Sequence, residues 1–223
     1  FGHTPLFFAC SSGSEACVRV LIGAGAHVEV TDTNGWTPLH AASRNGHPHC
    51  ARALLEAGAS IEASDLVGST PLHAACQHGH EACVLVLVAA GANSSAACIL
   101  GKTPLHCACE GGHAACTLHL LRAGASMGAV DHTGASPLHV ACATGRTTCV
   151  RALLEASAHL EARDKEGDTP LHVACKKGHA ACVRLLVHAG ASKEATNRAG
   201  HTPLSTATSL RYLMCIRPLL SAL

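Results

Sequence analysis

One tripeptide recurs along the chain at a constant interval, and this interval constrains the fold more than any other feature. Thr-Pro-Leu or Ser-Pro-Leu occurs seven times, each copy 33 residues after the one before, without an insertion or a deletion. The copies begin at Thr4, Thr37, Thr70, Thr103, Ser136, Thr169 and Thr202. A fixed period of this length is typical of a solenoid, in which each repeat covers its apolar side by stacking on its neighbours.

Each copy carries signals for two helices. Thr or Ser followed by Pro is an N-cap followed by the favoured first residue of a helix. A Gly nine residues after the Thr, such as Gly46, can take the left-handed conformation that ends a helix. A second segment with apolar residues at helical spacing follows, for example at residues 182–187, and most copies end it with another Gly. Ser157 replaces that Gly in the fifth copy, where a left-handed residue costs on the order of 1 kcal/mol.

The segments between the helix pairs carry Asp and Gly at turn positions, as in Asp32 and Gly35, and predict projecting hairpins. With residues 37–42 (TPLHAA), Gly46-His47 and their counterparts, the chain resembles the ankyrin repeat family over essentially its whole length. The resemblance implies an all-α repeat solenoid of stacked ankyrin helix pairs with projecting β-hairpin loops. It also implies a concave groove for partner proteins, and histidines that hydrogen-bond within and between repeats.

We therefore expect a single array over residues 1–223, with repeats that start near residues 1, 32, 65, 98, 131, 164 and 197. The chain starts at Phe1 rather than Met, and both ends carry apolar residues where solenoids need a polar cap. These features predict a fragment of a longer protein with flanking repeats or domains. The last copy has Arg211-Tyr212 in place of Gly-His, which indicates a degenerate capping repeat or a boundary with another domain.

Charge and hydropathy narrow the class of partner. Lys and Arg number 16 and Asp and Glu number 15, so the net charge of +1 offers no broad electrostatic footprint for nucleic acid or an anionic membrane. The longest apolar stretch, around residues 83–92, is far shorter than the roughly 20 residues of a membrane span. We expect neither nucleic-acid binding nor membrane insertion.

The 14 Cys and 18 His raise the alternative of a thiol-rich metal or redox buffer. Twelve of the Cys recur six or thirteen residues after the repeat Thr or Ser, where the family places core residues. Equivalent thiols in neighbouring repeats lie roughly 10 Å apart, too far to share a zinc ion. We predict core packing, with no metal and no cofactor. Free thiols in such number favour an intracellular location, in the cytoplasm or the nucleus.

No catalytic arrangement can be singled out, because every suggestive Cys or His has copies elsewhere, whereas a nucleophile needs a unique environment. We expect no enzyme but a scaffold or adaptor that binds a partner protein. The alternative is a substrate-recruiting or regulatory region of a larger enzyme, such as a ubiquitin-ligase adaptor or a kinase, whose catalytic part lies outside this chain.

Partner specificity is expected where the copies differ. Trp36 is the only Trp and falls at a variable loop tip, while two adjacent tips carry aliphatic pairs that either contact a partner or pack internally. This pattern predicts a groove that is apolar in copies two to four and charged in copies five to seven. The predicted partner-binding residues are Trp36, Asn34, Leu66, Val67, Ile99, Leu100, Lys102, His132, Lys165, Arg198, Arg44, His78, Lys176 and Lys177.

Overall fold

The computed structural model describes residues 2–220. They divide between two compact units, with the boundary between Ala125 (the end of unit 1) and Ser126 (the start of unit 2). Within the described residues all regular structure is helical, and none of the helices combines the length and the apolar character that crossing a bilayer requires. Unit 1 contains α1 (Pro5–Ser12), α2 (Glu15–Gly23), α3 (Pro38–Arg44), α4 (Pro48–Glu56), α5 (Pro71–His78), α6 (Glu81–Ala89), α7 (Pro104–Gly111) and α8 (Ala114–Arg122). Unit 2 contains α9 (Pro137–Ala143), α10 (Thr147–Glu155), α11 (Pro170–Lys176), α12 (Ala180–His188), α13 (Pro203–Ser209) and α14 (Leu213–Leu220).

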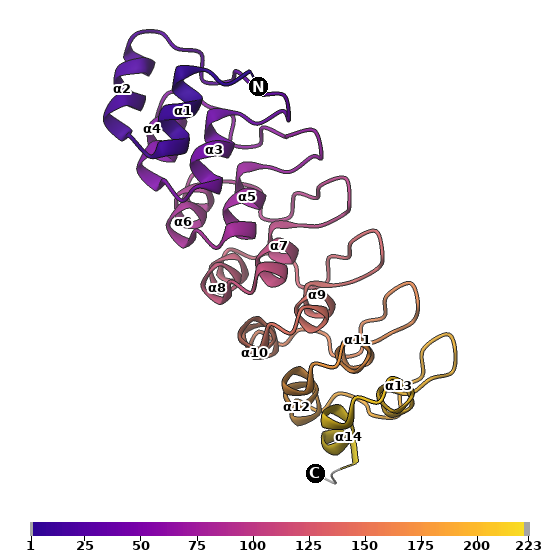
Figure 1. Cartoon of the computed structure of the whole chain (residues 1–223). Coiled ribbons are helices and arrows are strands. Elements are labelled where there is room, and N and C mark those ends of the chain that lie inside the picture. The colour runs from indigo at the N-terminus through magenta and orange to yellow at the C-terminus, as the bar shows by residue number, and fades with distance from the viewer. Residues whose placement is uncertain (1, 221–223) are drawn as a thin grey trace. The chain divides into compact units, whose positions relative to one another are not determined.

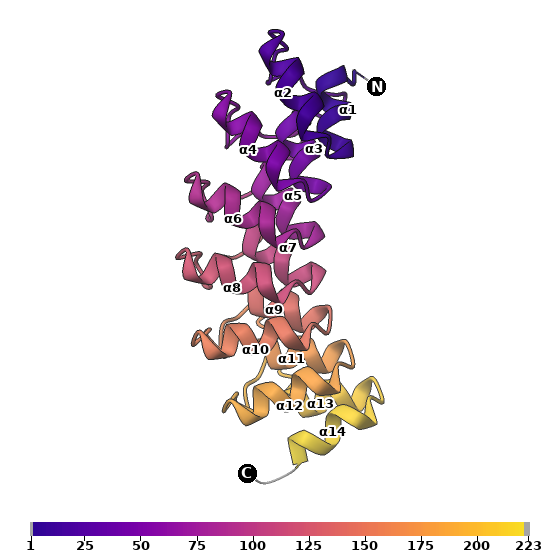
Figure 2. The ribbon, with the colours of Figure 1, turned by 90° about the vertical axis from the view of Figure 1, so that its left-hand side faces the viewer.

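Each unit is a stack of helix pairs in two layers. In unit 1, α1, α3, α5 and α7 pack on one another in succession, and α2, α4, α6 and α8 form the second layer. In unit 2 the two layers are α9, α11 and α13, and α10, α12 and α14 (Figure 2). In both units the connecting loops project on the side of the first helices, away from the second helices (Figure 1). The predicted all-α solenoid of helix pairs is confirmed.

The repeated Thr-Pro-Leu-His motif forms a capping box at the start of a first helix. In α5 the backbone N–H of Thr70 donates to Nδ1 of His73 at 3.1 Å, and the Thr70 side chain accepts from the backbone of His73. Nε2 of His73 lies 3.0 Å from the carbonyl oxygen of Lys102 in the next repeat. The same arrangement joins His40 to Ser69 and, in unit 2, His172 to His201. These histidines therefore tie the first helices that carry them to the following loop, as the resemblance implies.

Four of the loops are closed by an Asp at the start of the turn, and Cys98 and Asn197 occupy this position in the other two. In unit 1 the Asp65 N–H donates to the Ser69 carbonyl at 3.0 Å, and Oδ1 of Asp65 accepts the backbone N–H groups of Val67 and Ser69. Adjacent loops are joined by a single backbone bond, from Ile99 N–H to the Val67 carbonyl at 3.0 Å. One bond of this kind does not make a ladder, so the loops have hairpin turns but no strand within the described residues.

The repeated cysteines lie in the core, as predicted, with one exception. Eleven of the twelve repeat-position thiols are buried and all are unbonded to another cysteine. Burial raises the pKa of Cys10, Cys83 and Cys175 to about 12, so these thiols stay protonated. Cys17 is exposed, and its prediction as a core residue is wrong, because no described helix pair precedes α2 to cover it. The described residues contain no group of three or more His, Cys, Asp or Glu that could hold a metal ion.

Two non-glycine residues take the left-handed conformation that the repeat assigns to Gly. Ser157 has φ 65°, as its place in the fifth copy predicts, and Arg211 has φ 59°. The ring of Tyr212 packs against Gly178, in the way that His residues pack against the helix-ending Gly of earlier repeats. The last copy therefore keeps the backbone of a repeat and both of its helices, despite its altered sequence.

Ser43 stands in α3 at a position where five other copies have Cys, and it leaves a buried hydroxyl without a hydrogen-bond partner among the described residues. An unsatisfied buried polar group costs roughly 1–3 kcal/mol. Ser43→Cys is expected to raise the free energy of unfolding by roughly 1 kcal/mol, as measured by urea denaturation. Ser43→Ala removes the hydroxyl but leaves a void, so it should raise the free energy of unfolding by less than Ser43→Cys does. A loss of stability in the Cys variant would contradict this assignment.

Candidate functional site

Trp36 is held at the base of its loop by one contact from its own repeat and one from the next repeat. Its indole Nε1–H donates to Oδ2 of Asp65 in the next loop at 3.0 Å. The guanidinium of Arg44, at the end of α3, lies 4.4 Å from the centre of the indole ring. The side chain is half-buried, and its orientation is fixed from both sides. A fixed aromatic side chain loses little conformational freedom on binding a partner, which suits an interface anchor.

Two clefts open on either side of Trp36 in unit 1. One, of about 210 Å³, is lined by Trp36, Arg44 and His78 together with residues of the next repeats, including Gln77 and Cys107. The other, of about 490 Å³, shares Trp36, Arg44 and His78 and extends to His3 and Phe7 in the first repeat. The structure thus brings together four of the predicted residues between the loops and the first helices: Trp36, Arg44 and His78 line both clefts, and Asn34 lines the larger one.

The imidazole of His78 is shifted toward its neutral form. Burial lowers the pKa of His78, and the positive charge of Arg44 lowers it further. The neutral imidazole can both donate and accept a hydrogen bond. With the indole face and the Arg44 guanidinium, the cleft presents apolar area and a few polar groups, which is the composition of a protein-binding patch.

The aliphatic pairs on the two adjacent tips, Leu66 and Val67 on one and Ile99 and Leu100 on the next, are called the apolar tips here. Their exposed fractions are 73%, 48%, 58% and 56%. The two loops are bonded through their backbones, yet the side chains stay in contact with solvent. Of the two alternatives left open by the sequence, internal packing of these tips does not occur in this structure.

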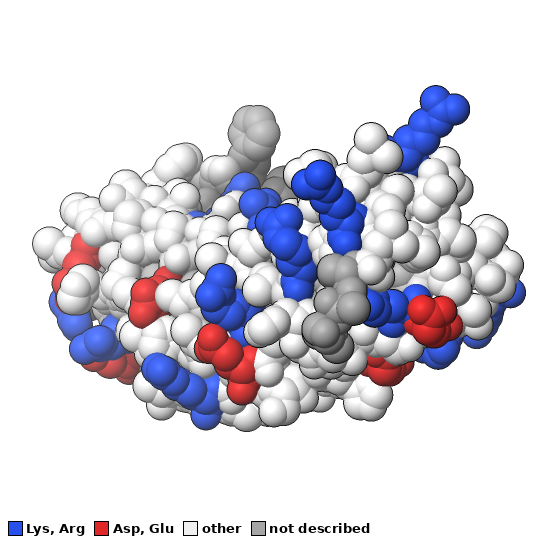
Figure 3. Space-filling view, turned by 90° about the horizontal axis from the view of Figure 1, so that it is seen from below, with Lys and Arg blue, Asp and Glu red and all other residues white. Residues whose placement is uncertain are grey.

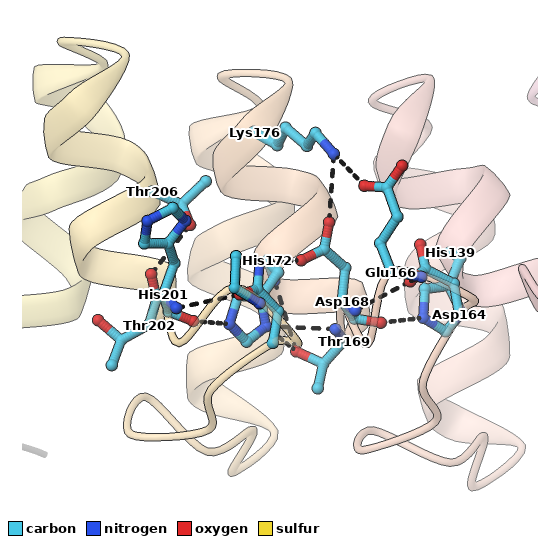
Figure 4. Close-up of polar contacts among 12 residues, drawn as sticks. His139, Asp164, Glu166, Asp168, Thr169, His172, Lys176, His201, Thr202 and Thr206 are labelled. Atoms are coloured by element: carbon cyan, nitrogen blue, oxygen red, sulfur yellow. Dashed lines mark hydrogen bonds and ion pairs between the residues drawn. The ribbon is translucent and has the colours of Figure 1, made fainter.

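The corresponding surface of unit 2 is charged. Nζ of Lys176, on α11, pairs with the carboxylates of Glu166 and Asp168 on the preceding loop (Figure 4). The Asp168 side chain also accepts a hydrogen bond from Asn197 of the next loop at 2.7 Å, and its backbone carbonyl lies 3.1 Å from Nε2 of His139. A cleft of about 470 Å³ between these loops is lined by Lys176, Glu166, Asp168, Arg198 and His201, with Thr206, Ser209, Leu210, Asn197 and Ala199.

The other predicted residues are distributed over both units. Lys102 is half-buried and forms an ion pair with Glu110 at 2.8 Å, so its ammonium already has a partner within unit 1. Asn34 is exposed and hydrogen-bonds the Asp32 carboxylate that closes its own turn. The remaining predicted residues are exposed in unit 2: His132, Lys165 and Arg198 lie on loop tips, and Lys177 directly follows α11.

Sequence reasoning missed the residues that position Trp36 and form the floor of its cleft. Asp65 was assigned only to its turn, yet its second oxygen holds the indole N–H. Gln77 and Cys107 line the cleft, and nothing in the sequence marks Gln77 for this position. Cys107 lies outside the two repeated cysteine positions, and this irregularity is the one signal that could have marked it.

Comparison with known proteins agrees with this arrangement. The family model described as ankyrin repeats (3 copies) matches residues 1–65, 60–131, 91–164, 112–197 and 161–222. A search of the curated proteins gave no match. The crystal structure of the human ASB11 ankyrin repeat domain is similar, with a TM-score of 0.86 and 33% identity over 98% of this chain and 97% of that one.

The ankyrin repeat domain of Bcl-3, described as a unique member of the IkappaB protein family, is also similar. Its TM-score is 0.83, with 32% identity over 97% of this chain and 99% of that one. Ankyrin repeat domains are in general protein–protein interaction modules. From its repeats, its helix pairs and these matches, the chain belongs to the ankyrin repeat family.

Proposed function

We propose that the chain is a scaffold or adaptor that binds a partner protein on the loops and first helices, and that it catalyses no reaction itself. The observation that carries the proposal is the exposure of the apolar tips beside the Trp36 clefts in unit 1. Four aliphatic side chains on two adjacent loops form an exposed apolar cluster of the kind that marks interaction sites. The fixed indole of Trp36 adds the type of residue that most often dominates binding energy.

The proposed interface differs in character between the units. In unit 1 the partner would bury aliphatic and aromatic area around Trp36 and the apolar tips. In unit 2 it would meet the charged residues Lys165, Lys176 and Arg198, with Glu166 as their acidic neighbour. Charged rim contacts contribute more to association rate and specificity than to affinity. The affinity is therefore expected to depend mainly on unit 1.

We further propose an intracellular location, in the cytoplasm or the nucleus. The supporting observation is that none of the fourteen cysteines forms a disulfide and that most of them are buried in the repeat core. Free thiols in this number persist in reducing compartments, whereas an oxidising compartment would promote disulfide exchange.

The binding proposal is tested with the double variant Leu66→Ala and Ile99→Ala. A partner captured with the wild-type chain is purified, and its affinity for wild type and variant is measured by calorimetry. We expect the double variant to bind at least about tenfold more weakly, which corresponds to roughly 1.4 kcal/mol. Its melting temperature should stay within about 2 °C of wild type, because both side chains are exposed.

Val20→Ala provides the matched control, because Val20 is 71% exposed but lies on α2, away from the loops. Trp36→Ala should also weaken binding, but it loses the Asp65 and Arg44 contacts and lowers stability as well. Equal affinities for the wild type and the tip variant would place the interface elsewhere. A large drop in melting temperature for the tip variant would instead make those residues structural.

A further inference from the structure

The second helices of unit 2 carry arginine at one repeated position. Arg151 on α10, Arg184 on α12 and Arg217 on α14 are each 33 residues apart, and all three are exposed. Because α10 packs on α12 and α12 on α14, the three positions follow one another along the second layer of the unit (Figure 2). The face seen in Figure 3 carries several Lys and Arg side chains close together, with a few Asp and Glu side chains on the same face. None of these three arginines forms an ion pair with a described residue.

The first repeat shows how an arginine at this position is neutralised. Nε of Arg19 lies 2.8 Å from Oε1 of Glu15, one turn earlier on α2, and its Nη1 lies 3.1 Å from Oε2 of Glu56 on α4. Four repeats further on, Arg151 occupies the position of Arg19. At the same shift of four repeats, Thr147 occupies the position equivalent to Glu15, and His188 occupies the position equivalent to Glu56. Both acids that balance the arginine in unit 1 are thus replaced in unit 2 by groups without negative charge.

The same substitutions form the wall of a cleft. Between α10 and α12 lies an open cleft of about 490 Å³, lined by Thr147, Arg151, Ala181, Arg184, Leu185 and His188. It contains two guanidinium groups, an imidazole and a hydroxyl, and none of the described residues that line it is acidic. A guanidinium has only donors, arranged in a planar fork that matches a carboxylate. The cleft therefore fits an anionic acceptor.

We propose that Arg151, Arg184 and Arg217, with His188, form a docking surface for an extended acidic segment of a protein partner. Packed helices are spaced by roughly 10 Å, and an extended chain in the polyproline II conformation advances about 3.1 Å per residue with three residues per turn, so every third side chain lies on the same face. An acidic side chain at every third residue of the segment would therefore meet one arginine in each repeat. This surface lies on the second helices of unit 2, so it is separate from the loops and first helices of the proposed function.

A peptide suits this surface better than a polyanion such as nucleic acid or a membrane. Glu155 lies one turn after Arg151 on α10 and is exposed, so a continuous array of negative charge would meet it. The chain as a whole has a net charge of only +1. Polyanion binding depends on a broad basic surface, whereas a row of separated guanidiniums selects carboxylates at matching intervals.

The test uses the full chain and a fluorescein-labelled peptide of about ten residues, with Glu at every third position and Gly or Ser between. A second peptide has Gln in place of each Glu. Fluorescence anisotropy should show saturable binding of the Glu peptide, at least about tenfold tighter than that of the Gln peptide. Binding should weaken as NaCl is raised from roughly 50 to 300 mM, because exposed charge pairs are screened.

Two sets of variants locate the binding site. Arg151→Gln with Arg184→Gln should weaken binding of the Glu peptide at least about tenfold. Thr147→Glu with His188→Glu, which restores the acids found around Arg19, should weaken it similarly while both arginines remain. Arg52→Gln is the control, because Arg52 is an exposed arginine at the same repeat position in unit 1. All of these positions are at the surface, and circular dichroism checks that each variant is folded.

Three results would overturn the proposal. The first is equal affinity of the wild-type chain for the Glu and Gln peptides, or no binding of either. The second is unchanged affinity in both double variants. The third is binding of duplex DNA or of phosphatidylserine vesicles that is lost in the same variants while the Glu peptide does not bind.

Discussion

Replacing Gly79 by alanine is expected to lower the free energy of unfolding by roughly 3 kcal/mol. Gly79 follows α5 with φ 76°, a conformation that costs a residue with a Cβ about 1–2 kcal/mol. The new Cβ would also lie 2.6 Å from Cε1 and 2.7 Å from Cγ of His113, in the next repeat. That ring is held by a contact of 3.1 Å from its Nε2 to the Gln77 carbonyl oxygen. Displacing it adds a packing cost of roughly 1–3 kcal/mol.

Gly91→Ala is the matched control for this prediction. Gly91 has φ 91° in the same repeat, but a Cβ there meets no atom within 4 Å. Gly91→Ala should therefore show only the cost of placing a Cβ on a left-handed backbone. The free energies of unfolding of the two variants, measured by urea denaturation followed by circular dichroism, are expected to differ by roughly 1–3 kcal/mol. In a His113→Ala background the difference should disappear, because the clash is with the ring. If Gly79→Ala and Gly91→Ala were equally destabilising, the ring contact would have no energetic role.

Acidification is expected to destabilise the chain from about pH 6.5 downward. In the capping boxes the backbone N–H of Thr37, Thr70 or Ser136 donates to Nδ1 of the histidine, so this nitrogen carries no proton. Burial lowers the pKa of His40, His73 and His139 in the folded state, below the ordinary histidine value of 6.5. Hydrogen bonds to the next loop and nearby carboxylates oppose the shift without cancelling it.

The sign of the effect follows from which state binds more protons. Between the folded pKa and 6.5 the unfolded chain is protonated at these histidines and the folded chain is not. Their stabilising contribution is therefore complete above pH 6.5 and is lost as the pH falls through the folded pKa. The free energy of unfolding changes with pH by at most about 1.4 kcal/mol per pH unit for each histidine. Urea denaturation at a series of pH values from about 7.5 to 5 measures it.

His73→Gln tests the assignment to the capping boxes. Glutamine at this position can still accept the Thr70 N–H in a capping box, but it does not titrate. The variant should be less stable at pH 7.5 by roughly 1 kcal/mol, because the bond to the Lys102 carbonyl is lost, and its pH slope should be smaller. His132→Gln, on an exposed loop outside any capping box, is the control. An unchanged slope in His73→Gln would assign the acid sensitivity to other groups.

Most of the fold could be predicted because the information is local and repeated. The Thr-Pro pair fixes the start of each first helix, and the Gly after it fixes the end, so a single copy specifies a helix and seven copies specify the stack. The same repetition identified the structural histidines and the core cysteines. Cys17 was assigned wrongly for the same reason, since its burial depends on a preceding neighbour and the residue type carries no information about that.

The candidate site was less predictable, because its residues are set by contacts across repeats. Trp36 was marked as variable and aromatic, but the hydrogen bond to Asp65 and the position of Arg44 over its ring depend on side-chain directions. Lys102 and Lys176 were predicted to face a partner, yet each pairs with an acid of its own unit. The sequence did not single out the arginines of the second helices, because their proposed role depends on which side chains of the neighbouring helix lie beside them.

The sequence by itself determined that the chain folds as repeated helix pairs and where each helix begins and ends, since caps, prolines and glycines act over a few residues. Only the tertiary structure decided which exposed apolar side chains stay uncovered, which charges are already paired and which arginines are left without an acid. These properties depend on groups about 30 residues apart in the chain, as in the 29-residue separation between Trp36 and Asp65, which stacking brings within hydrogen-bonding distance.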